Sequence, residues 1–428
     1  MEAVKSGPAA PSVAGGMHVV VTTFGSDGDF NPLLAIAAAL VRRGIAVTFV
    51  ANPFYGRRVR DSGSTFVGAG TFVDTFAVLQ ANPCYLSTGS GLRALWRELI
   101  VPSIHAIYPV VRDTAREVGA PVVVSHVLSF GGAWAAATCG VRSAIVSTTP
   151  LVWLSRHQPT VFANWRAPRP VQGALMVAMR ELGGVAVRRT IRALARDVGA
   201  PVVADIVRAA DLNIGVWPEW FRAPAPDDPP RSQASGFVYD PTAAAAPLPP
   251  QLESFFADGD APVIAAFGSA ASLHAADRYR AVADACEKLG RRCLLIGASA
   301  AAVAATPNVL RVASAPYVRV FPRAAAIVHH GGFGTCGEAL RAGKPSLVTP
   351  FAFDQFDTGA RVQDAGVGVW FRGDAQNPDA VQAALEPVLH SAALAATARS
   401  VAATIAAEQN GADRAAELIE RLARSPTR

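Results

Sequence analysis

The sequence predicts an α/β protein with two doubly wound, parallel-sheet domains, and three observations lead to this prediction. The chain has 428 residues, of which 51% are apolar, so it is long enough to bury two cores of ordinary size. Residues 18–51 begin with an apolar run, continue with helical spacing and end with a second apolar run. Residues 324–349 repeat that order near the other end of the chain. Strand, helix and strand in this order form the repeating unit of a parallel sheet.

The first domain is predicted over residues 17–238, after a leader at 1–16 that is rich in small residues and is expected to be disordered. The apolar run at 18–23 (HVVVTT) is a short buried strand, and residues 31–44 have the spacing of a helix that a glycine ends. The loop at 24–30 between them (FGSDGDF) is expected at the carboxyl end of the sheet, where doubly wound folds bind ligands.

Two later strands of the first domain lead into segments of unusual composition. The strand at 121–124 ends in Ser125-His126, and the strand at 144–149 is followed by an aromatic segment at 151–165. That segment is interpreted either as a wall for an apolar ligand or as ordinary core. Residues 166–200 carry seven arginines against two acids, with apolar residues at helical spacing. This stretch is interpreted either as a solvated helix over a cleft or as a dock for anionic lipids or a carboxylate-bearing lipid acceptor.

The second domain is predicted over residues 259–408, after a Pro- and Ala-rich interdomain linker at 239–258. Its first strand, at 262–267, is closed by Gly268-Ser269, and further apolar runs continue the sheet. The final segment, 409–428, has helical spacing and is expected to return to the first domain.

Charge and cysteine content exclude several classes of protein. The net charge is +6 and the pI about 9.3, but the arginines are dispersed and no aromatic-interleaved basic tract suggests nucleic-acid binding. Attraction to anionic substrates or lipid surfaces accounts for the charge. Five scattered cysteines without metal-ligand spacing indicate a reducing, cytoplasmic location and no structural zinc; one disulfide with spare thiols is the alternative. No secretory signal or apolar run of about twenty residues is present, so a soluble protein is expected.

The most informative stretch is AAAIVHHGGFGTCGEALRAGKPSLVTPFAFDQ at 324–355. Its strand ends at a glycine loop that opens a helix, and backbone N–H groups with a positive helix end favour a phosphate or diphosphate. A bare glycine loop is also compatible with a simple tight turn. The surrounding side chains favour the ligand: His330 and Thr335 can donate to phosphate, and Glu338 can accept from a ribose hydroxyl. Asp354 and Gln355, after the next strand, suit sugar hydroxyls.

HHGGFGT, then E, AGKP, and P followed by DQ together resemble the donor-binding signature of the UDP-glycosyltransferase family, glycosyltransferase family 1. Similar bacterial members include the rhamnolipid rhamnosyltransferase chain, sterol glucosyltransferases and glycopeptide and macrolide glycosyltransferases. The resemblance extends from residue 17 to the C-terminus and implies the GT-B fold, in which two Rossmann-like domains face each other across a cleft. Relatives continue DQ with Asn-Ala after two residues, where this chain has Thr358-Gly359.

The resemblance implies an inverting, metal-independent hexosyltransferase. A hexose would move from a UDP-sugar or dTDP-sugar to a hydroxyl of a small hydrophobic or amphipathic acceptor, with no cofactor beyond the nucleotide sugar. Relatives stack an aromatic residue on the base at the position of Ser314, so stacking is here expected from Tyr317 and the base stays open. The implied donor-binding residues are Gly268, Ser269, Ala315, Tyr317, His330, Gly332, Phe333, Gly334, Thr335, Glu338, Asp354 and Gln355.

The family's loop after the first strand often reads GHxNP with a catalytic histidine, and here it reads Gly-Asp-Phe-Asn-Pro. Asp29 therefore stands in the place of the general base, and His126 stands where the orienting acid of relatives would lie. Asp29 as a helix cap and His126 as a buried, satisfied histidine are the alternatives. The DxD-like Asp27-Gly28-Asp29 is not interpreted as a metal site, because that motif belongs to a later strand of a single-domain fold. The proposed acceptor-binding residues are Phe30, Trp134, Trp153 and His157.

Three other functions stay open from the sequence. A dTDP-rhamnose-dependent rhamnosyltransferase acting on a hydroxy-fatty-acid lipid is the nearest of them. A nucleotide-sugar epimerase would share the architecture but needs no acceptor wall, and a non-catalytic auxiliary subunit would not need the intact donor signature. A nucleotide-sugar donor and a hydrophobic acceptor are the expected partners, with peripheral contact to an anionic membrane as a further hypothesis and the oligomeric state open.

Overall fold

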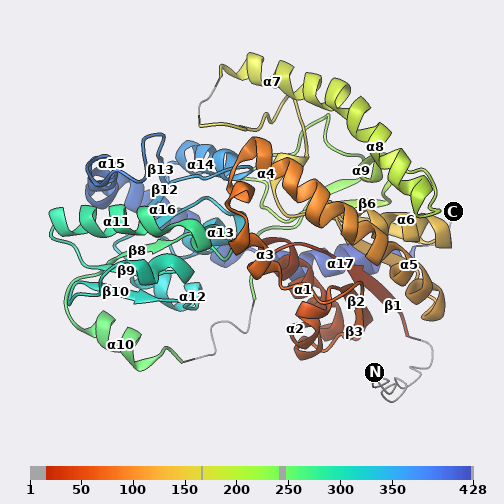
Figure 1. The fold of residues 1–428 in the computed structure, drawn as a ribbon, viewed down its shortest axis with the longest axis horizontal. Coiled ribbons are helices and arrows are strands. Elements are labelled where there is room, and N and C mark those ends of the chain that lie inside the picture. Colours follow the sequence, from red (N-terminus) through yellow and green to blue (C-terminus); the bar gives the residue numbers. More distant parts are fainter. Residues whose placement is uncertain (1–15, 165–166, 241–246, 426–428) are drawn as a thin grey trace.

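The computed structural model describes residues 16–164, 167–240 and 247–425. It contains two parallel sheets, each flanked by helices and lying next to the other (Figure 1). The predicted α/β architecture with two doubly wound domains is confirmed. Nearly all of the expected leader and part of the expected linker fall outside the described residues, as do 165 and 166 between the aromatic and arginine-rich segments.

The first sheet has the strand order β3-β2-β1-β4-β5-β6-β7, and all of its pairs are parallel. Its central strands are buried on both faces, as the unbroken valine runs of β1 and β4 predict, whereas the edge strands β3 and β7 are partly exposed. The strands are β1 (His18–Thr22), β2 (Ala46–Ala51), β3 (Thr65–Gly68), β4 (Val122–His126), β5 (Arg142–Ser147), β6 (Leu212–Gly215) and β7 (Ser232–Ala234).

Nine helices between the start of the first domain and β6 flank this sheet in the described part of the chain, most of them amphipathic, with the apolar side on a core cluster. They are α1 (Asp27–Arg42), α2 (Gly56–Asp61), α3 (Thr75–Ala81), α4 (Thr88–Leu95), α5 (Val101–Glu117), α6 (Phe130–Cys139), α7 (Arg169–Ala178), α8 (Gly184–Asp197) and α9 (Ile206–Ala209).

The second sheet has the order β10-β9-β8-β11-β12-β13 and is also parallel throughout. Its strands are β8 (Val263–Ala266), β9 (Cys293–Ile296), β10 (Val309–Val312), β11 (Ala326–His329), β12 (Ser346–Val348) and β13 (Gly368–Trp370). Its helices are α10 (Pro250–Ala257), α11 (Ala276–Lys288), α12 (Tyr317–Val320), α13 (Phe333–Arg341), α14 (Gln355–Asp364), α15 (Pro378–His390) and α16 (Ala392–Ala407).

The last helix, α17 (Gly411–Arg424), packs on the core of the first sheet beside α1. Its apolar residues Ala415, Leu418 and Ile419 are buried there, and Arg42 reaches Asp413 across the contact at 2.6 Å. Asn410 caps this helix and also contacts the backbone of Tyr239, so the chain leaves and re-enters the first domain at one place.

Both sheets have a point where the strand order reverses, between β1 and β4 in the first and between β8 and β11 in the second. The loops after these strands diverge there and leave a crevice at the carboxyl edge, which is where doubly wound folds bind ligands. Asp29 lies in the first turn of the helix that follows β1, His126 ends β4, and Gly268 and His330 follow β8 and β11, so the topology alone brings the predicted residues of each domain together.

All five cysteines are free thiols. In the described part of the chain no single helix is long and apolar enough to cross a membrane, although one pair, bent by 68° near the C-terminal end, passes by length and composition.

Candidate active site

Asp29 and His126 meet at the carboxyl edge of the first sheet. The predicted helix begins four residues earlier than expected, because Ser26 caps α1 and places Asp29 in its first turn. The Ser26 N–H donates to Asp29 Oδ2 at 3.1 Å, which turns Oδ1 toward His126 Nε2 at 3.6 Å. Gly25 has φ +94°, and a Cβ there would collide with the Asp29 carboxylate. The backbone of this loop is therefore shaped around that carboxylate.

The proton position on His126 follows from its partners. The Leu128 N–H donates to Nδ1 at 3.3 Å, so the neutral ring carries its proton on Nε2. Nε2 lies 3.1 Å from the Thr148 hydroxyl and faces Asp29. Burial lowers the pKa of His126, although the charge of Asp29 raises it. The neutral ring thus directs its Nε2–H toward the Thr148 hydroxyl and the Asp29 carboxylate.

Burial raises the pKa of Asp29, while His126 and the Ser26 donors act in the opposite direction. A carboxylate with a raised pKa is a stronger base than an ordinary one. Its side chain is 29% exposed and that of His126 only 1%, so Asp29 is the member that an incoming ligand can reach. Asp29 can therefore accept a proton from a ligand, while His126 orients its carboxylate from the buried side.

The ring of His330 lies between two glycines of the second domain. A Cβ on Gly332 would lie 2.1 Å from its Nε2, and one on Gly268 would lie 2.7 Å from its Cε1. Either methyl group would displace the imidazole, so both positions require glycine for this close approach as well as for the turn. The structure thus brings together three of the predicted donor-binding residues, from the loops after β8 and β11.

His330 is buried and uncharged. Burial lowers its pKa to about 4; a hydrogen bond with the backbone of Ala266 opposes this effect, and the nearby Arg278 adds to it. Its Nδ1 has no hydrogen-bond partner among the described residues. An orphaned buried ring nitrogen at the start of a helix, beside backbone N–H groups with no partner in that helix, fits a bound anion.

The remaining residues at the start of α13 have different surroundings. Gly334 is exposed, and a Cβ there would meet nothing within 4 Å, whereas Thr335 is buried. The Phe333 ring packs on Phe221 and Phe237 with centroids 5.6 and 5.2 Å away, so it anchors the helix start.

Glu338 and Tyr317 lie one turn further along α13 and beside it. Glu338 pairs with Arg341 at 2.6 Å, and burial raises its pKa against that partner. Burial raises the pKa of Tyr317 to about 12, with Thr335 and Glu338 as its polar neighbours. One ring face of Tyr317 is stacked on Phe321 at 4.4 Å. Ala315 packs beside it on the core, and Ser269 remains partly exposed in the loop after β8.

The loop that carries Asp354 is held by Gln355 itself. Gln355 Oε1 accepts from the N–H groups of Phe351 and Ala352 at 2.7 and 3.2 Å. Phe353 has φ +57°, a conformation that side chains other than glycine rarely adopt and that often marks functional loops. With its oxygen engaged, Gln355 has only its amide N–H groups to offer a ligand.

Asp354 is the residue that joins the two halves of the site. Burial raises its pKa to about 7, and the charges of Asp29 and Asp357 raise it further, while the Thr149 hydroxyl opposes them. Asp29 and Thr149 belong to the first domain and Asp354 to the second. The pair at β1 and β4 and the loop after β12 therefore face each other across the domain boundary.

Arg278 is a site residue that sequence reasoning missed. From the first turn of α11, its Nη1 donates to the carbonyl oxygens of Thr349 and Pro350 at 2.7 and 3.1 Å. Its guanidinium carbon lies 3.4 Å from the centre of the Phe351 ring. Burial lowers its pKa to about 10, so it remains a cation near His330. No motif signals it, because its partners are backbone carbonyls far along the chain.

Of the four predicted acceptor-binding residues, the structure places three in the interior. Phe30 stacks on Tyr55 at 3.9 Å, and the Trp134 indole N–H donates to the Val203 carbonyl at 2.9 Å. Trp153 is 3% exposed and donates to Ser147 at 3.0 Å. These rings pack the core; for Trp153 this is the core alternative for the aromatic segment, and for Phe30 and Trp134 it corrects the prediction that they bind the acceptor.

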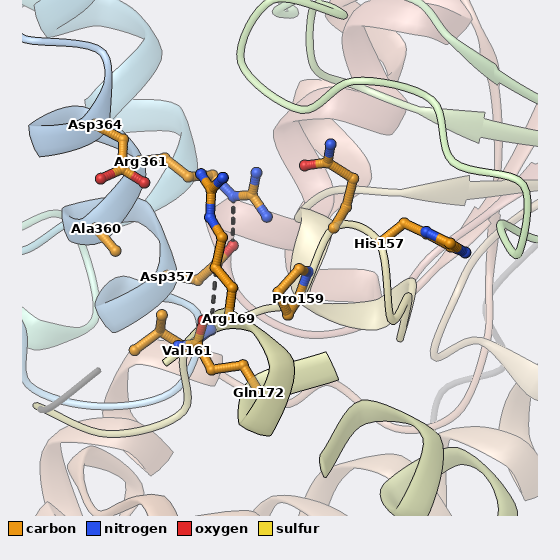
Figure 2. A pocket seen from close by; sticks show the side chains of 10 residues that line it. His157, Pro159, Val161, Arg169, Gln172, Asp357, Ala360, Arg361 and Asp364 are labelled. Carbon is orange, nitrogen blue, oxygen red and sulfur yellow. Dashed lines mark hydrogen bonds and ion pairs between the residues drawn. The ribbon is translucent and has the colours of Figure 1, made fainter. Parts of the chain in front are cut away.

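His157 lines a cavity of about 110 Å³ between the domains. Figure 2 shows it opposite Asp357 and Arg361 of α14, with Arg169 of α7 at the near side. Asp357 accepts from the Val161 N–H at 3.1 Å and from Arg361 Nε at 2.7 Å. The aromatic segment is thus tied directly to the helix that Gln355 begins.

No group of three or more His, Cys, Asp or Glu side chains in the described residues is arranged to hold a metal ion. Metal independence remains a prediction.

Comparisons with known proteins agree with this arrangement. Residues 294–421 match the family model described as Erythromycin biosynthesis protein CIII-like, C-terminal domain. The chain is 28% identical over 434 residues to the O-mycaminosyltylonolide 6-deoxyallosyltransferase of Streptomyces fradiae, covering 96% of this chain and 99% of that protein. It is 29% identical over 417 residues to the vancomycin aglycone glucosyltransferase of Amycolatopsis orientalis, covering 91% and 96%.

The fold is shared with solved glycosyltransferases. The spinosyn rhamnosyltransferase SpnG, solved with thymidine diphosphate, superposes with a TM-score of 0.66 at 20% identity, over 95% of this chain and 99% of that one. The two facing parallel-sheet domains are therefore those of the GT-B fold. With the donor signature and the nearly full-length similarity, these findings show that the chain is similar to glycosyltransferases of family 1, the UDP-glycosyltransferase family.

Proposed function

We propose that the protein transfers a hexose from a nucleoside-diphosphate sugar to a hydroxyl group of a hydrophobic natural product, with inversion at the anomeric carbon. One observation carries this proposal: the partly exposed carboxylate of Asp29, which buried His126 contacts, faces the loop of the second domain that carries Asp354. Asp29 of the first domain is near enough to Asp354 of the second for its charge to add to the effect of burial on the pKa of Asp354, which supports a base and a sugar site on two sides of one cleft.

The donor diphosphate is proposed to lie at the start of α13. Backbone N–H groups there and the N–H of neutral His330 would donate to its oxygens. Asp354 would accept from the sugar hydroxyls, and the amide of Gln355 would donate to them. Glu338 would exchange its contact with Arg341 for the ribose hydroxyls, since it lies one turn further into the same helix.

The acceptor hydroxyl would lose its proton to Asp29 as it attacks. Inversion requires attack from the side opposite the leaving diphosphate, and Asp29 belongs to the opposite domain. His126 Nε2–H would support the carboxylate through the reaction without itself carrying the charge. Such a base contributes about a hundredfold to ten-thousandfold in rate.

The departing diphosphate gains negative charge as the glycosidic bond breaks, and a neutral His330 offers only a hydrogen bond against it. Arg278 lies close enough to lower the pKa of His330, and its positive charge is proposed to stabilise the negative charge that develops on the leaving diphosphate. Preorganised donors of this kind typically contribute about a hundredfold in rate each.

Both UDP and dTDP are proposed as donor nucleotides. Glu338 suits the two hydroxyls of a ribose and favours UDP, whereas the complex of the spinosyn rhamnosyltransferase with thymidine diphosphate favours dTDP. The names of two relatives give O-mycaminosyltylonolide and vancomycin aglycone as their acceptors, so a large hydrophobic aglycone is the proposed acceptor class.

The test is a matrix of UDP- and dTDP-hexoses against macrolide aglycones, glycopeptide aglycones and hydroxy fatty acids, with glycosides detected by mass spectrometry. His330→Ala should lower turnover more than donor affinity, because its hydrogen bond strengthens as charge develops. A wild-type enzyme that interconverts sugar nucleotides without any acceptor would instead be an epimerase. Full turnover in His330→Ala would contradict the placement of the diphosphate.

A further inference from the structure

A continuous helical ridge runs along the outside of the first domain. It consists of α7, the π-helical turn η5 (Met179–Gly183) and α8, and Figure 1 shows it along the outer edge of the molecule. Its inner side is fixed to the protein, because Met176, Ile191 and Ala195 are buried there. The ridge is thus an ordered part of the domain with one long side turned to solvent.

The solvent side of the ridge carries large apolar side chains. Leu182 is 75% exposed, Val171 55% and Leu175 46%. Most of the exposed large apolar residues of the described chain gather here, and three- and four-residue steps connect those from Val171 to Val185. A monomeric surface rarely keeps such a row uncovered. The full set is Val171, Leu175, Met179, Leu182, Val185 and Val187.

Positive charge accompanies this row. The ridge holds six arginines against the two acids Glu181 and Asp197. Arg180 is paired with Glu181 and Asp227, whereas Arg188, Arg189 and Arg192 have no acidic partner within the described residues. Cations without partners beside exposed apolar groups are the combination that an anionic lipid surface satisfies, since the headgroups pair with the arginines and the acyl boundary takes the apolar side chains.

We propose that the outer face of this ridge docks the enzyme on a lipid bilayer that contains anionic headgroups. The length of the ridge, the apolar row and the excess of arginine are those of a helix that lies in the plane of a membrane interface. Arg169, the first residue of α7, also lines the cavity between the domains in Figure 2. Docking would therefore bring one wall of that cavity toward the bilayer, where hydrophobic acceptors partition.

The test is flotation of the full chain with vesicles of phosphatidylcholine, and with vesicles in which phosphatidylglycerol replaces about a quarter of it. Wild type should bind the anionic vesicles, bind the neutral ones at least about tenfold more weakly, and be released by high salt. Arg189→Glu removes one positive charge and adds a negative one, so it should weaken binding about 25-fold, at about fivefold per charge. Leu182→Ser should weaken it at least about tenfold.

Matched controls come from other surfaces. The side chain of Arg57 on α2 is 92% exposed, and Arg57→Glu should change binding less than about twofold. Phe72 is exposed in the loop after β3, and Phe72→Ser should likewise bind as wild type. Thermal melts verify that each variant folds, and donor binding in solution is measured separately, so a failure of the proposed reaction does not affect the result.

Two outcomes would overturn the proposal. One is equal binding of wild type, Arg189→Glu and Leu182→Ser to anionic vesicles, or no binding by any of them. The other is a stable dimer, seen by light scattering, that Leu182→Ser dissociates, because a second copy would then be what covers the ridge.

Discussion

Replacing Asp29 by Asn separates the catalytic role of this residue from its structural one. The substitution keeps the shape of the side chain and an oxygen that can still accept from the Ser26 N–H, now 3.1 Å from Oδ2. The loss of a negative charge in the first turn of α1 costs about 0.3–1 kcal/mol, and relief of the burial that raises the pKa of Asp29 acts in the opposite direction. For a chain of this size, the melting temperature should fall by about 2 °C or less.

The effect on turnover should be far larger. An amide cannot take the acceptor proton, so the variant should lose about a hundredfold to ten-thousandfold in kcat, or roughly 3–5 kcal/mol of barrier. Donor affinity should not change, because the donor contacts belong to the other domain. The pH profile gives a second readout: burial raises the pKa of Asp29 above its ordinary value of 3.8. Activity of the wild type should therefore fall, as pH drops, at a higher pH than for a free carboxylate.

Asp27→Asn is the matched control. Asp27 lies two residues earlier in the same turn, and its carboxylate pairs with Arg58 at 2.6 Å, not with His126. Both variants change one charge at one helix start, but only one changes the base. The assays are kcat and KM for a detected glycoside, nucleotide affinity by calorimetry, and thermal melts. Turnover of Asp29→Asn within tenfold of the control would refute the assignment and leave His126 as the better candidate.

Three other predictions concern the donor side. Gly332→Ala should lower kcat at least about tenfold, because its Cβ would lie 2.1 Å from His330 Nε2. Gly334→Ala is the control and should melt at the wild-type temperature, because its Cβ would meet nothing within 4 Å. Equal melting temperatures and turnover of the two variants would contradict this prediction. Arg278→Gln should lower kcat about tenfold to a hundredfold with a smaller change in KM, and Arg278→Lys should recover part of the lost kcat. A change in KM alone would indicate that Arg278 only holds the loop at Thr349 in place. Binding of a sugar nucleotide at pH 6 should release a proton, because Asp354, with a pKa of about 7, is protonated at that pH and sugar hydroxyls favour its ionised form. Calorimetry in two buffers should detect this release for the wild type and none for Asp354→Asn.

The two sheets and the meeting of Asp29 with His126 could be predicted from the sequence because both depend on local order. Apolar runs alternating with helical spacing specify a parallel sheet, and the carboxyl ends of parallel strands lie on one edge. His126, the last residue of β4, and Asp29, in the first turn of the helix after β1, are therefore both brought to that edge. The glycine signature around His330 behaves in the same way, since its motif and its geometry are contained in one short stretch.

Features that depend on packing over long distances could not be predicted. Arg278 acts on carbonyl groups of a loop on the other side of β11, and carbonyl groups leave no trace in the sequence. Trp134 and Trp153 resembled ligand walls by composition, but their neighbours fill the space around them. The amide oxygen of Gln355 accepts a hydrogen bond from the Phe351 N–H of its own loop. This contact accompanies the left-handed backbone at Phe353, which the sequence does not indicate.

The most direct test of the central claim, that a nucleoside diphosphate binds at the start of α13, is thermal unfolding with UDP and dTDP. At a hundred times its Kd, a ligand stabilises the folded state by about 2.7 kcal/mol. At least one nucleotide should raise the melting temperature of the wild type and of Asp29→Asn equally. Glu338→Ala should respond less, because the ribose contact is lost. No response to either nucleotide, or a full response in Glu338→Ala, would contradict the account.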